Sequence, residues 1–225
     1  IIVNSPNGNI SVELTLKETD GTLSYLVKNS TIEIIAASKL GITASSIDFS
    51  SELSYVSDNI NPIDENYQLP TGKTKNYTNK CNELNVEFSK GTKKMHVLFR
   101  VYDDGVAYRY YIPGAGTLQI TSELSEVNIP TYQTSWGQKY SHDYSTLYPA
   151  RTWAGVAAIE NNKMSVPVLI RSSIGNNNWC LITESANYGT YCASDLMTGT
   201  IDEIGHFYFK LYENVDVNLP LKTSW

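Results

Sequence analysis

The sequence is poor in charged residues and has no excess of basic ones. Only 18% of its 225 residues are charged, and the formal net charge is -6. A protein that binds nucleic acid or anionic lipid needs a positive surface to neutralise the phosphates. The apolar runs are also shorter than the roughly 20 residues that a membrane-spanning helix requires. We therefore expect neither a nucleic-acid partner nor membrane insertion.

Cysteine is scarce as well. The chain has three cysteines, Cys81, Cys180 and Cys192, and this odd number excludes a framework in which every thiol is paired. Cys180 and Cys192 flank a predicted hairpin, so a disulfide between them is one alternative and buried free thiols are the other. The cysteines therefore leave the redox compartment open.

The common short catalytic signatures are missing. The sequence has no phosphate-binding glycine loop, no HExxH motif, no GxSxG motif and no paired CxxC. The histidines His96, His142 and His206 are too widely spaced to resemble a metal cluster, so we interpret them as ordinary polar or packing residues. The 23 acidic residues allow a catalytic carboxylate pair, but sequence spacing alone does not identify one.

A repeated strand pattern is what the sequence does contain. Apolar and polar residues alternate over 10–16 and again over 22–27, with the turn residues Asp20 and Gly21 between them. This pattern predicts an opening β-hairpin. Three more strands are predicted in succession at 83–89, 95–102 and 106–112. We expect one domain over residues 1–225, a large all-β sandwich of two antiparallel sheets.

Some segments depart from this pattern. Residues 54–80 and 132–153 have no strand period and predict two long loops. Loops of that length in a compact domain usually bind something or pack against a neighbour. Residues 38–46 suggest a short helical turn, and residues 155–160 suggest a further strand.

Two places stand out as candidate sites. Glu184 directly follows the apolar strand pattern at 181–183, and a carboxylate at a strand end can reach into a cleft or hold a hard cation such as calcium. A solvated turn residue is the alternative. Trp136, Tyr140 and Tyr144 gather aromatic rings in the second predicted loop. Such rings stack on sugars or pack between domains, and the residues alone favour neither.

Several motifs together resemble one family, the N-terminal domain of glycoside hydrolase family 97, whose members include bacterial α-glucosidases and α-galactosidases. The resemblance covers nearly the whole chain. Its most specific motif is FRVYDDGVAYRY at 99–110. The other motifs are SPNGN at 5–9, SKLGI at 38–42, NEL at 82–84, LITE at 181–184, and Trp136 with Tyr140 and Tyr144.

The resemblance implies a galactose-mutarotase-like β-super-sandwich, followed in the full-length protein by a catalytic (β/α)8 barrel and a C-terminal β domain. In such enzymes the catalytic carboxylates belong to the barrel, so we expect no catalytic residue in this chain and no activity of the chain alone. In the calcium-dependent glucosidases of the family, a glutamate of the N-terminal domain reaches a calcium ion at the active site. Glu184 matches that glutamate, and Trp136, Tyr140 and Tyr144 become candidate contacts to substrate or to the barrel.

The charged residues of the longest motif have a structural interpretation. Arg100, Asp103, Asp104 and Arg109 flank a tight turn between two predicted core strands. Charges in that position fix the hairpin and its contact with a neighbouring domain. We assign none of them a catalytic role.

The resemblance therefore predicts an N-terminal domain of an exo-acting α-glycosidase that acts on α-linked oligosaccharides, in the periplasm or outside a bacterial cell. The start at Ile1 without Met and the stop at Trp225 suggest that a leader and a following domain have been removed. A stand-alone carbohydrate-binding module and a purely structural β-sandwich are the alternatives. The choice between glucosidase and galactosidase, and between inversion and retention, depends on carboxylates of the barrel.

Overall fold

The computed structural model describes residues 1–141, 146–173, 178–186, 191 and 194–225. Within these residues the regular structure is almost entirely strand, and the strand pairs are antiparallel. The strands form two sheets. The predicted all-β, two-sheet fold is confirmed.

In the described part of the chain, the larger sheet has the order β1-β2-β3-β4-β11-β17-β16-β14-β12-β13, and β15 pairs with β14. Its strands are β1 (Ile2–Asn4), β2 (Ile10–Leu16), β3 (Leu23–Asn29), β4 (Ile32–Leu40), β11 (Glu126–Asn128), β12 (Tyr132–Lys139), β13 (Ala150–Arg151), β14 (Lys163–Ser172), β15 (Trp179–Ile182), β16 (Ser194–Thr198) and β17 (His206–Leu211).

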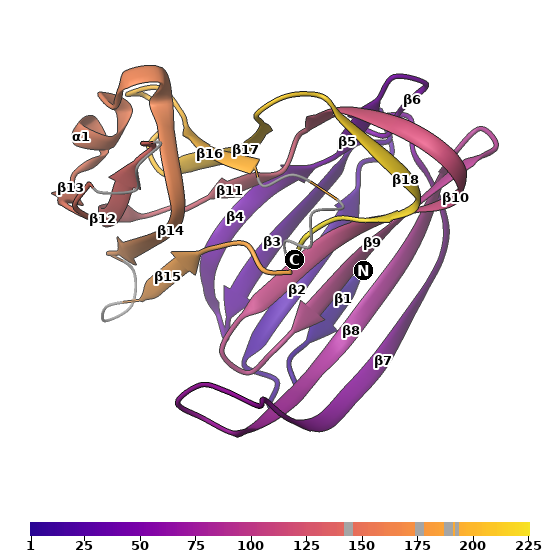
Figure 1. Ribbon diagram of the computed structural model, residues 1–225, viewed down its shortest axis with the longest axis horizontal. Coiled ribbons are helices and arrows are strands. Elements are labelled where there is room, and N and C mark those ends of the chain that lie inside the picture. Colours follow the sequence, from indigo (N-terminus) through magenta and orange to yellow (C-terminus); the bar gives the residue numbers. More distant parts are fainter. Residues whose placement is uncertain (142–145, 174–177, 187–190, 192–193) are drawn as a thin grey trace.

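The smaller sheet has the order β6-β5-β10-β9-β8-β7, and β18 pairs with β10. Its strands are β5 (Ile42–Ala44), β6 (Ile47–Asp48), β7 (Ser54–Gln68), β8 (Asn76–Lys90), β9 (Lys93–Val101), β10 (Val106–Glu123) and β18 (Val215–Lys222). Two short helices complete the described structure, the α-helix α1 (Trp153–Ala157) and the 3-10 helix η1 (Glu160–Asn162). Figure 1 shows β1 to β4 layered behind β7 to β10, with a lobe formed by β12 to β16 and α1 at one side.

The main core lies between the two sheets. On β8, the buried residues Leu84, Val86 and Phe88 alternate with partly exposed polar residues, as expected for a strand with one face in a core. Each of them lies opposite a buried apolar residue of β9, in the pairs Leu84–Phe99, Val86–Val97 and Phe88–Met95. Strands β2 and β3 of the larger sheet supply the opposite wall of this cluster.

A second, smaller apolar cluster lies in the lobe beside the sandwich. Its centre is a group of rings, with centroids 5.2 Å apart for Tyr132 and Trp153 and 5.4 Å apart for Trp153 and Phe207. Trp153 and Val156 are one helical turn apart and both are buried, so α1 covers the cluster with one face. The prediction of a strand at 155–160 is therefore wrong, because the apolar spacing there is helical.

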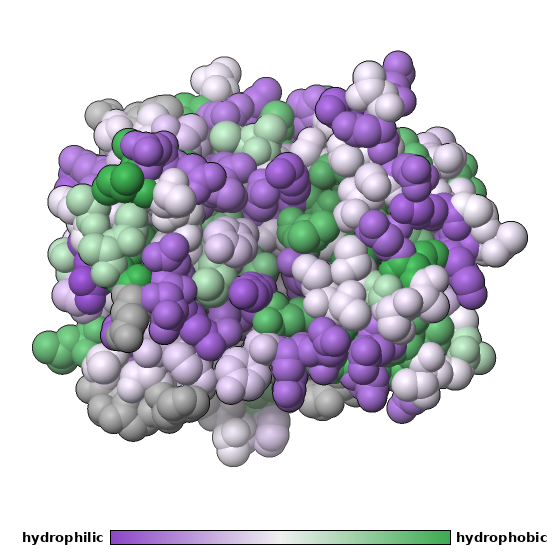
Figure 2. All heavy atoms as spheres, turned by 90° about the horizontal axis from the view of Figure 1, so that it is seen from above, coloured by the Kyte–Doolittle hydropathy of each residue, from purple (hydrophilic) through white to green (hydrophobic). Residues whose placement is uncertain are grey.

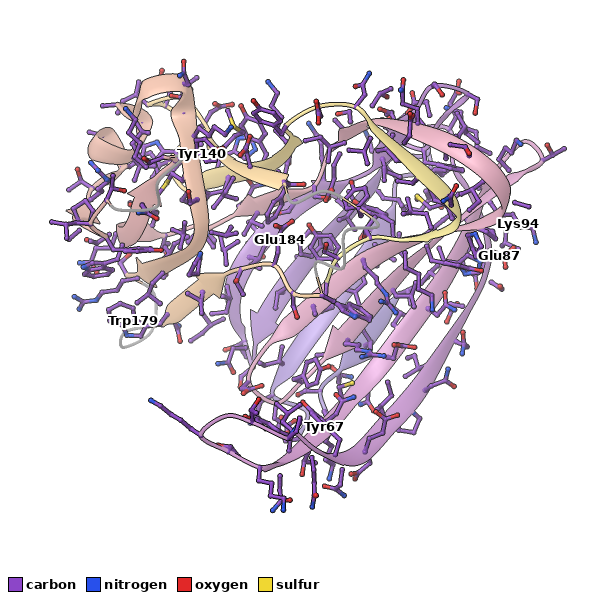
Figure 3. All side chains as sticks on the ribbon, viewed as in Figure 1. Tyr67, Glu87, Lys94, Tyr140, Trp179 and Glu184 are labelled. Carbon is purple, nitrogen blue, oxygen red and sulfur yellow. The ribbon has the colours of Figure 1, made fainter. Side chains whose placement is uncertain are left out.

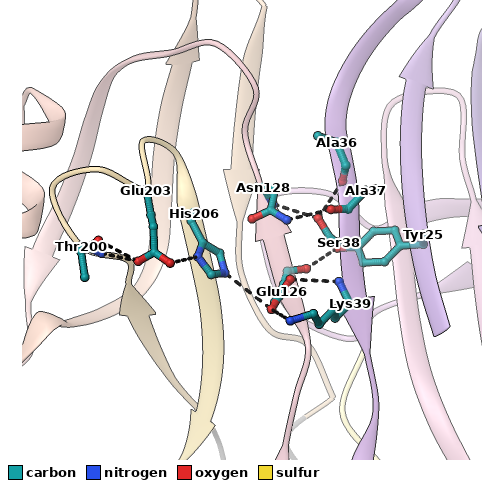
Figure 4. A network of polar contacts seen from close by, with 10 residues as sticks. All are labelled: Tyr25, Ala36, Ala37, Ser38, Lys39, Glu126, Asn128, Thr200, Glu203 and His206. Atoms are coloured by element: carbon teal, nitrogen blue, oxygen red, sulfur yellow. Dashed lines mark hydrogen bonds and ion pairs between the residues drawn. The ribbon is translucent and has the colours of Figure 1, made fainter. Parts of the chain in front are cut away.

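A polar network joins β11 and β17, which lie beside the lobe in the larger sheet, to β3 and β4 of the sandwich (Figure 4). Glu126 on β11 accepts a hydrogen bond from the backbone N–H of Lys39 at 3.2 Å, and its backbone oxygen accepts one from the Tyr25 hydroxyl at 2.9 Å. On β17, His206 lies 3.7 Å from a Glu126 carboxylate oxygen and 3.8 Å from one of Glu203. Strands β3, β4, β11 and β17 are thus tied together by side chains as well as by backbone pairing.

The face of the smaller sheet that points away from the core is polar. Arg100 pairs with Glu83 at 2.7 Å, and Lys94 pairs with Glu87 at 2.6 Å; Glu87 and Lys94 are labelled in Figure 3. Seen from above, the molecule shows hydrophilic and hydrophobic residues interspersed over its surface (Figure 2). Among the helices in the described residues, none is both long enough and apolar enough to cross a membrane.

The prediction of a long loop at 54–80 is wrong. Strands β7 and β8 form a long antiparallel hairpin there, in continuous register from Ser57–Glu87 to Gln68–Asn76. Nearly every residue of β7 is exposed, so the strand needs no apolar alternation, and its backbone hydrogen bonds to β8 stabilise it instead.

The prediction of a second loop, at 132–153, is wrong in part. Residues 132–139 form β12 and residues 150–151 form β13. Polar residues of β12, Ser135 and Gln138, are buried, which hides the strand from a search for apolar alternation. The helical turn expected at 38–46 is also wrong, because β4 runs to Leu40 and β5 starts at Ile42, with both residues buried in the core.

Candidate functional site: the Glu184 pocket

β15 ends at Ile182, and Glu184 follows it after one intervening residue, Thr183. β15 is held against β14 by the pairs Val168–Ile182 and Leu169–Leu181, as the strand prediction for this segment requires. After Glu184 the chain forms a second backbone pairing, because Ser185 and Trp225 exchange two N–H···O hydrogen bonds of 2.9 Å each. Glu184 is therefore fixed on both sides, by a strand and by the segment that follows β18.

A pocket opens around Glu184, between the lobe and the smaller sheet. Its walls come from the start and end of β10, from the end of β15, from β17 and from the segment after β18. The lining residues are Val106, Ala107, Tyr108, Glu123, Leu181, Thr183, Glu184, Ser185, Tyr191, Phe209, Thr223, Ser224 and Trp225. Figure 3 shows Glu184 at the centre of the molecule, in front of β10.

Two carboxylates lie in this pocket and share one hydrogen-bonding neighbour. Glu184 is half-buried, and its Oε1 accepts a hydrogen bond from the backbone N–H of Ser194 at 3.2 Å. The hydroxyl of the same serine lies 3.5 Å from Oε2 of Glu123, at the limit of a hydrogen bond. The pocket is thus acidic and oxygen-rich.

Glu123 was not among the residues that the sequence singled out. Its carboxylate accepts hydrogen bonds from the Ser125 hydroxyl at 2.7 Å and from the Tyr191 hydroxyl at 2.8 Å. Burial raises the pKa of Glu123 above its ordinary value, although the hydrogen bonds from Ser125, Tyr191 and Ser194 act in the opposite direction. Two of its three partners, Tyr191 and Ser194, lie 68 and 71 residues away in the sequence, and for this reason no local pattern marks it.

Trp225 closes one side of the pocket and is held by two arginines. The guanidinium carbons of Arg100 and Arg109 lie 4.5 Å and 3.9 Å from the centroid of its ring, within the range of a cation–π contact. Both arginines belong to the motif at 99–110, for which we expected a structural role. That role is to hold the segment after β18 on the smaller sheet.

The same motif also anchors the start of the chain. Asp103, in the turn between β9 and β10, accepts a hydrogen bond at 2.9 Å from the backbone N–H of Asn7. Asn7 belongs to the SPNGN motif at 5–9. Two of the motifs that carry the resemblance therefore contact each other in the fold.

Two of the three predicted aromatic residues, Trp136 and Tyr140, lie outside the lining of the pocket. Trp136 is on β12 and its ring packs against Trp179, with centroids 5.4 Å apart. Tyr140 lies under the ammonium group of Lys163, at 3.8 Å from the ring centroid. Figure 3 places Tyr140 and Trp179 in the lobe, away from Glu184. Tyr144, the third predicted contact, is outside the described residues.

The donor set of the pocket suits calcium as a partial site. Calcium takes six to eight oxygen ligands, and Glu184 offers a half-buried carboxylate in an oxygen-rich pocket. Among the described residues no group of three or more His, Cys, Asp and Glu side chains is arranged to hold a metal ion. A calcium ion bound by Glu184 would therefore need further oxygen ligands beyond this one carboxylate.

The two described cysteines, Cys81 and Cys180, lie outside the pocket lining. Cys180 is a free thiol, and burial raises its pKa to about 11; its candidate disulfide partner, Cys192, is outside the described residues. Cys81 is free and buried, and burial raises its pKa too. Thiols with raised pKa values are poor nucleophiles near neutral pH.

Comparisons with known proteins agree with the sequence motifs. A family model described as "Glycosyl-hydrolase 97 N-terminal" matches residues 3–225. A protein named "Probable retaining alpha-galactosidase" from Streptomyces bingchenggensis (strain BCW-1) is 29% identical over 219 residues, which is 94% of this chain and 32% of that protein.

Solved structures share the fold. A structure titled "Crystal structure of beta-arabinopyranosidase" superposes with a TM-score of 0.89 at 22% identity, over 100% of this chain and 39% of that one. A glycoside hydrolase family 97 enzyme in complex with acarbose, from Pseudoalteromonas sp. strain K8, superposes with a TM-score of 0.78 at 22% identity, over 97% of this chain and 34% of that one. The chain thus spans about a third of the length of the proteins it resembles.

Proposed function

Because the chain belongs to the N-terminal domain family of glycosyl hydrolase 97, we propose that it completes the active site of an exo-acting α-glycosidase. In this proposal the full-length protein also carries a catalytic (β/α)8 barrel and a C-terminal β domain. The barrel supplies the catalytic carboxylates, and this chain supplies Glu184. The substrates are α-linked oligosaccharides, ending in α-glucose or α-galactose, and the enzyme works in the periplasm or outside the cell.

The observation that carries the proposal is the position of Glu184 beside Trp225. Glu184 lines a pocket that Trp225 also lines, and Ser185, the next residue in the sequence, is paired with Trp225 through the backbone. The backbone beside Glu184 is thus fixed, while its half-buried carboxylate remains part of the pocket lining. A carboxylate held in this way is well placed to contribute to a site that a second domain completes.

Calcium is the cofactor we propose for the shared site, with Glu184 as the ligand from this chain. A bound calcium ion would supply positive charge to orient substrate oxygens and to stabilise negative charge that develops on them. Ser194 would hold the Glu184 carboxylate through its backbone N–H. Arg100 and Arg109 would keep the junction in place through Trp225.

The experiment compares the full-length protein with the chain 1–225 on nitrophenyl α-glucoside and nitrophenyl α-galactoside, with and without a calcium chelator. We expect the full-length protein to hydrolyse one of the two substrates and the chain alone to hydrolyse neither. Glu184→Gln should lower kcat/KM at least about tenfold and weaken the response to the chelator, because a carboxylate ligand is replaced by a neutral amide.

Glu213→Gln is the matched control. Glu213 is exposed and lies outside the pocket lining, so the same chemical change there should leave activity and the chelator response unaltered. Hydrolysis by the chain alone would contradict the division of labour proposed here. If the Glu184→Gln variant is as active as the unaltered enzyme, Glu184 does not contribute to the active site. Tight sugar binding by the chain alone would favour a stand-alone carbohydrate-binding module.

A further inference from the structure

Glu123 links the core of the sandwich to the segment that holds Glu184. It is the last residue of β10, and its carboxylate receives hydrogen bonds from Tyr191 and, at 3.5 Å, from Ser194. Tyr191 and Ser194 are both buried. Tyr191 lies between Glu184 and β16 in the sequence, and Ser194 is the first residue of β16. One carboxylate therefore contacts the chain after Glu184 at two points.

The other side of Glu123 is fixed by the core. The Ser125 hydroxyl donates to Glu123 and also bonds to the hydroxyl of Tyr110 at 2.9 Å. Tyr110 is fully buried, and its hydroxyl accepts a hydrogen bond from the backbone N–H of Gly41 at 2.9 Å. This series of bonds gives Glu123 one orientation, because Ser125 and Tyr110 are themselves held by buried groups.

Ser194 connects the fixed carboxylate of Glu123 to that of Glu184. Its hydroxyl faces Glu123, and its backbone N–H donates to Glu184 at 3.2 Å. Outer groups that orient a metal ligand typically change metal affinity 10- to 100-fold when they are removed. We propose that Glu123, itself held by Tyr191, is a positioning residue that orients Glu184 for calcium through Ser194; this inference rests on the function proposed for Glu184.

The test measures the calcium Kd of the full-length protein by isothermal titration calorimetry after chelator treatment, with the thermal unfolding midpoint as a check on folding. Glu123→Ala removes the carboxylate that accepts hydrogen bonds from the hydroxyls of Tyr191 and Ser194. This substitution should raise the calcium Kd about tenfold. Glu123→Gln keeps the size of the side chain and one acceptor oxygen, which can serve both Tyr191 and Ser194 because both bond Oε2. The calcium Kd of this variant should therefore stay within about threefold of the unaltered protein.

Glu126→Ala is the matched control, since Glu126 is a half-buried carboxylate nearby in sequence that lies outside the pocket. It should leave the calcium Kd unchanged. Tyr191→Phe and Ser194→Ala remove the two hydroxyls while keeping Glu123, and each should raise the calcium Kd even if Glu123→Ala fails to fold.

A double variant separates positioning from general loosening of the fold. If Glu123 acts through Glu184, Glu123→Ala should raise the calcium Kd little further in a Glu184→Gln background. Full additivity of the two substitutions would overturn the proposal, as would an unchanged Kd in Glu123→Ala, Tyr191→Phe and Ser194→Ala together. An unchanged calcium Kd in Glu184→Gln alone would instead overturn the function proposed for Glu184.

Discussion

At the scale of single residues, Glu123 makes the stability of the fold depend on pH. Burial raises its folded pKa above the ordinary value of 4.5. In the pH range between these two values the folded state binds a proton that the unfolded state releases, so the free energy of unfolding falls as the pH rises through this range. Above this range both states have released the proton, and below it both states hold it, so in neither case does Glu123 make the free energy of unfolding change further with pH.

We therefore expect Glu123→Gln to stabilise the chain relative to the unaltered protein more at about pH 8 than at about pH 4.5. The measurement is urea unfolding of both proteins at the two pH values. Glu213→Gln, at an exposed position, should show no such difference. Stability differences that are equal at the two pH values would mean that Glu123 has no raised pKa in the folded protein.

Sequence reasoning found one of the two pocket carboxylates and missed the other. Glu184 was identifiable because it ends an apolar strand pattern and because the LITE motif matches a family position. Glu123 sits in the sequence Ser122–Ser125, which resembles an ordinary polar strand end. Its environment is made by Tyr191 and Ser194, which only the folded chain brings near it.

At the scale of elements, the hairpin of β7 and β8 divides into a core part and an exposed part. Leu84 and its neighbours on β8 are buried, whereas the far end of the hairpin is exposed or half-buried. The side-chain contacts there include a stacked pair, Tyr67 and Tyr77, with ring centroids 5.4 Å apart, and two exposed hydrogen bonds, from Gln68 to Asn76 at 2.9 Å and from Thr78 to Asn66 at 2.8 Å. Each such cross-strand pair contributes about 0.2–1 kcal/mol.

We expect that replacing residues 66–78 with a two-residue Asn-Gly turn between Glu65 and Asn79 will lower the thermal unfolding midpoint of the chain by no more than about 3 °C. These two residues are directly opposite each other, so the shortened hairpin keeps its register. Leu84→Ala is the comparison, and it should cost about 3 kcal/mol because it removes fully buried apolar atoms. If the shortened hairpin loses as much stability as Leu84→Ala does, the exposed end has a structural role that its contacts do not indicate.

The strands that sequence reasoning recovered are those with one buried face. The alternation in β2, β8 and β9 follows from their position over the main core. β7 has no buried face and β12 buries polar residues, so neither produces that alternation. Backbone pairing with a neighbouring strand stabilises both of them, and such pairing is invisible in the sequence of the strand itself.

At the scale of the whole molecule, the fold has two apolar clusters of unequal size. The larger one fills the sandwich, and the smaller one lies under α1 in the lobe. Ile35 on β4 packs against both clusters. Together with the network around Glu126 and His206 (Figure 4), this contact connects the two parts of the molecule.

Because local opening requires less free energy where fewer buried contacts are lost, we expect the lobe to open more readily than the sandwich. Hydrogen-exchange mass spectrometry under native conditions should find slower amide exchange in β8 and β9 than in β12 and β14. Phe207→Ala should speed exchange mainly in the lobe, and Phe99→Ala in the sandwich. Equal protection of both regions would indicate one cooperative unit.

The two-sheet class was predictable from the sequence because it depends on many strands with the same alternation. The division into two clusters was not, because Tyr132 and Trp153 of the smaller cluster both come from the predicted loop at 132–153, whereas Phe207 comes from β17. Their convergence follows from the long-range pairing of β11 with β17 and of β12 with β14.

The pairing of Ser185 with Trp225 also sets an order of events during synthesis. The ribosome makes residue 185 well before residue 225, and domains begin to fold as they emerge. The two hydrogen bonds that fix the backbone next to Glu184 cannot form until Trp225 has emerged. Most strands of both sheets are available by then, so the acidic pocket is among the last parts to be completed, and a nascent chain stalled before Trp225 would lack its final shape.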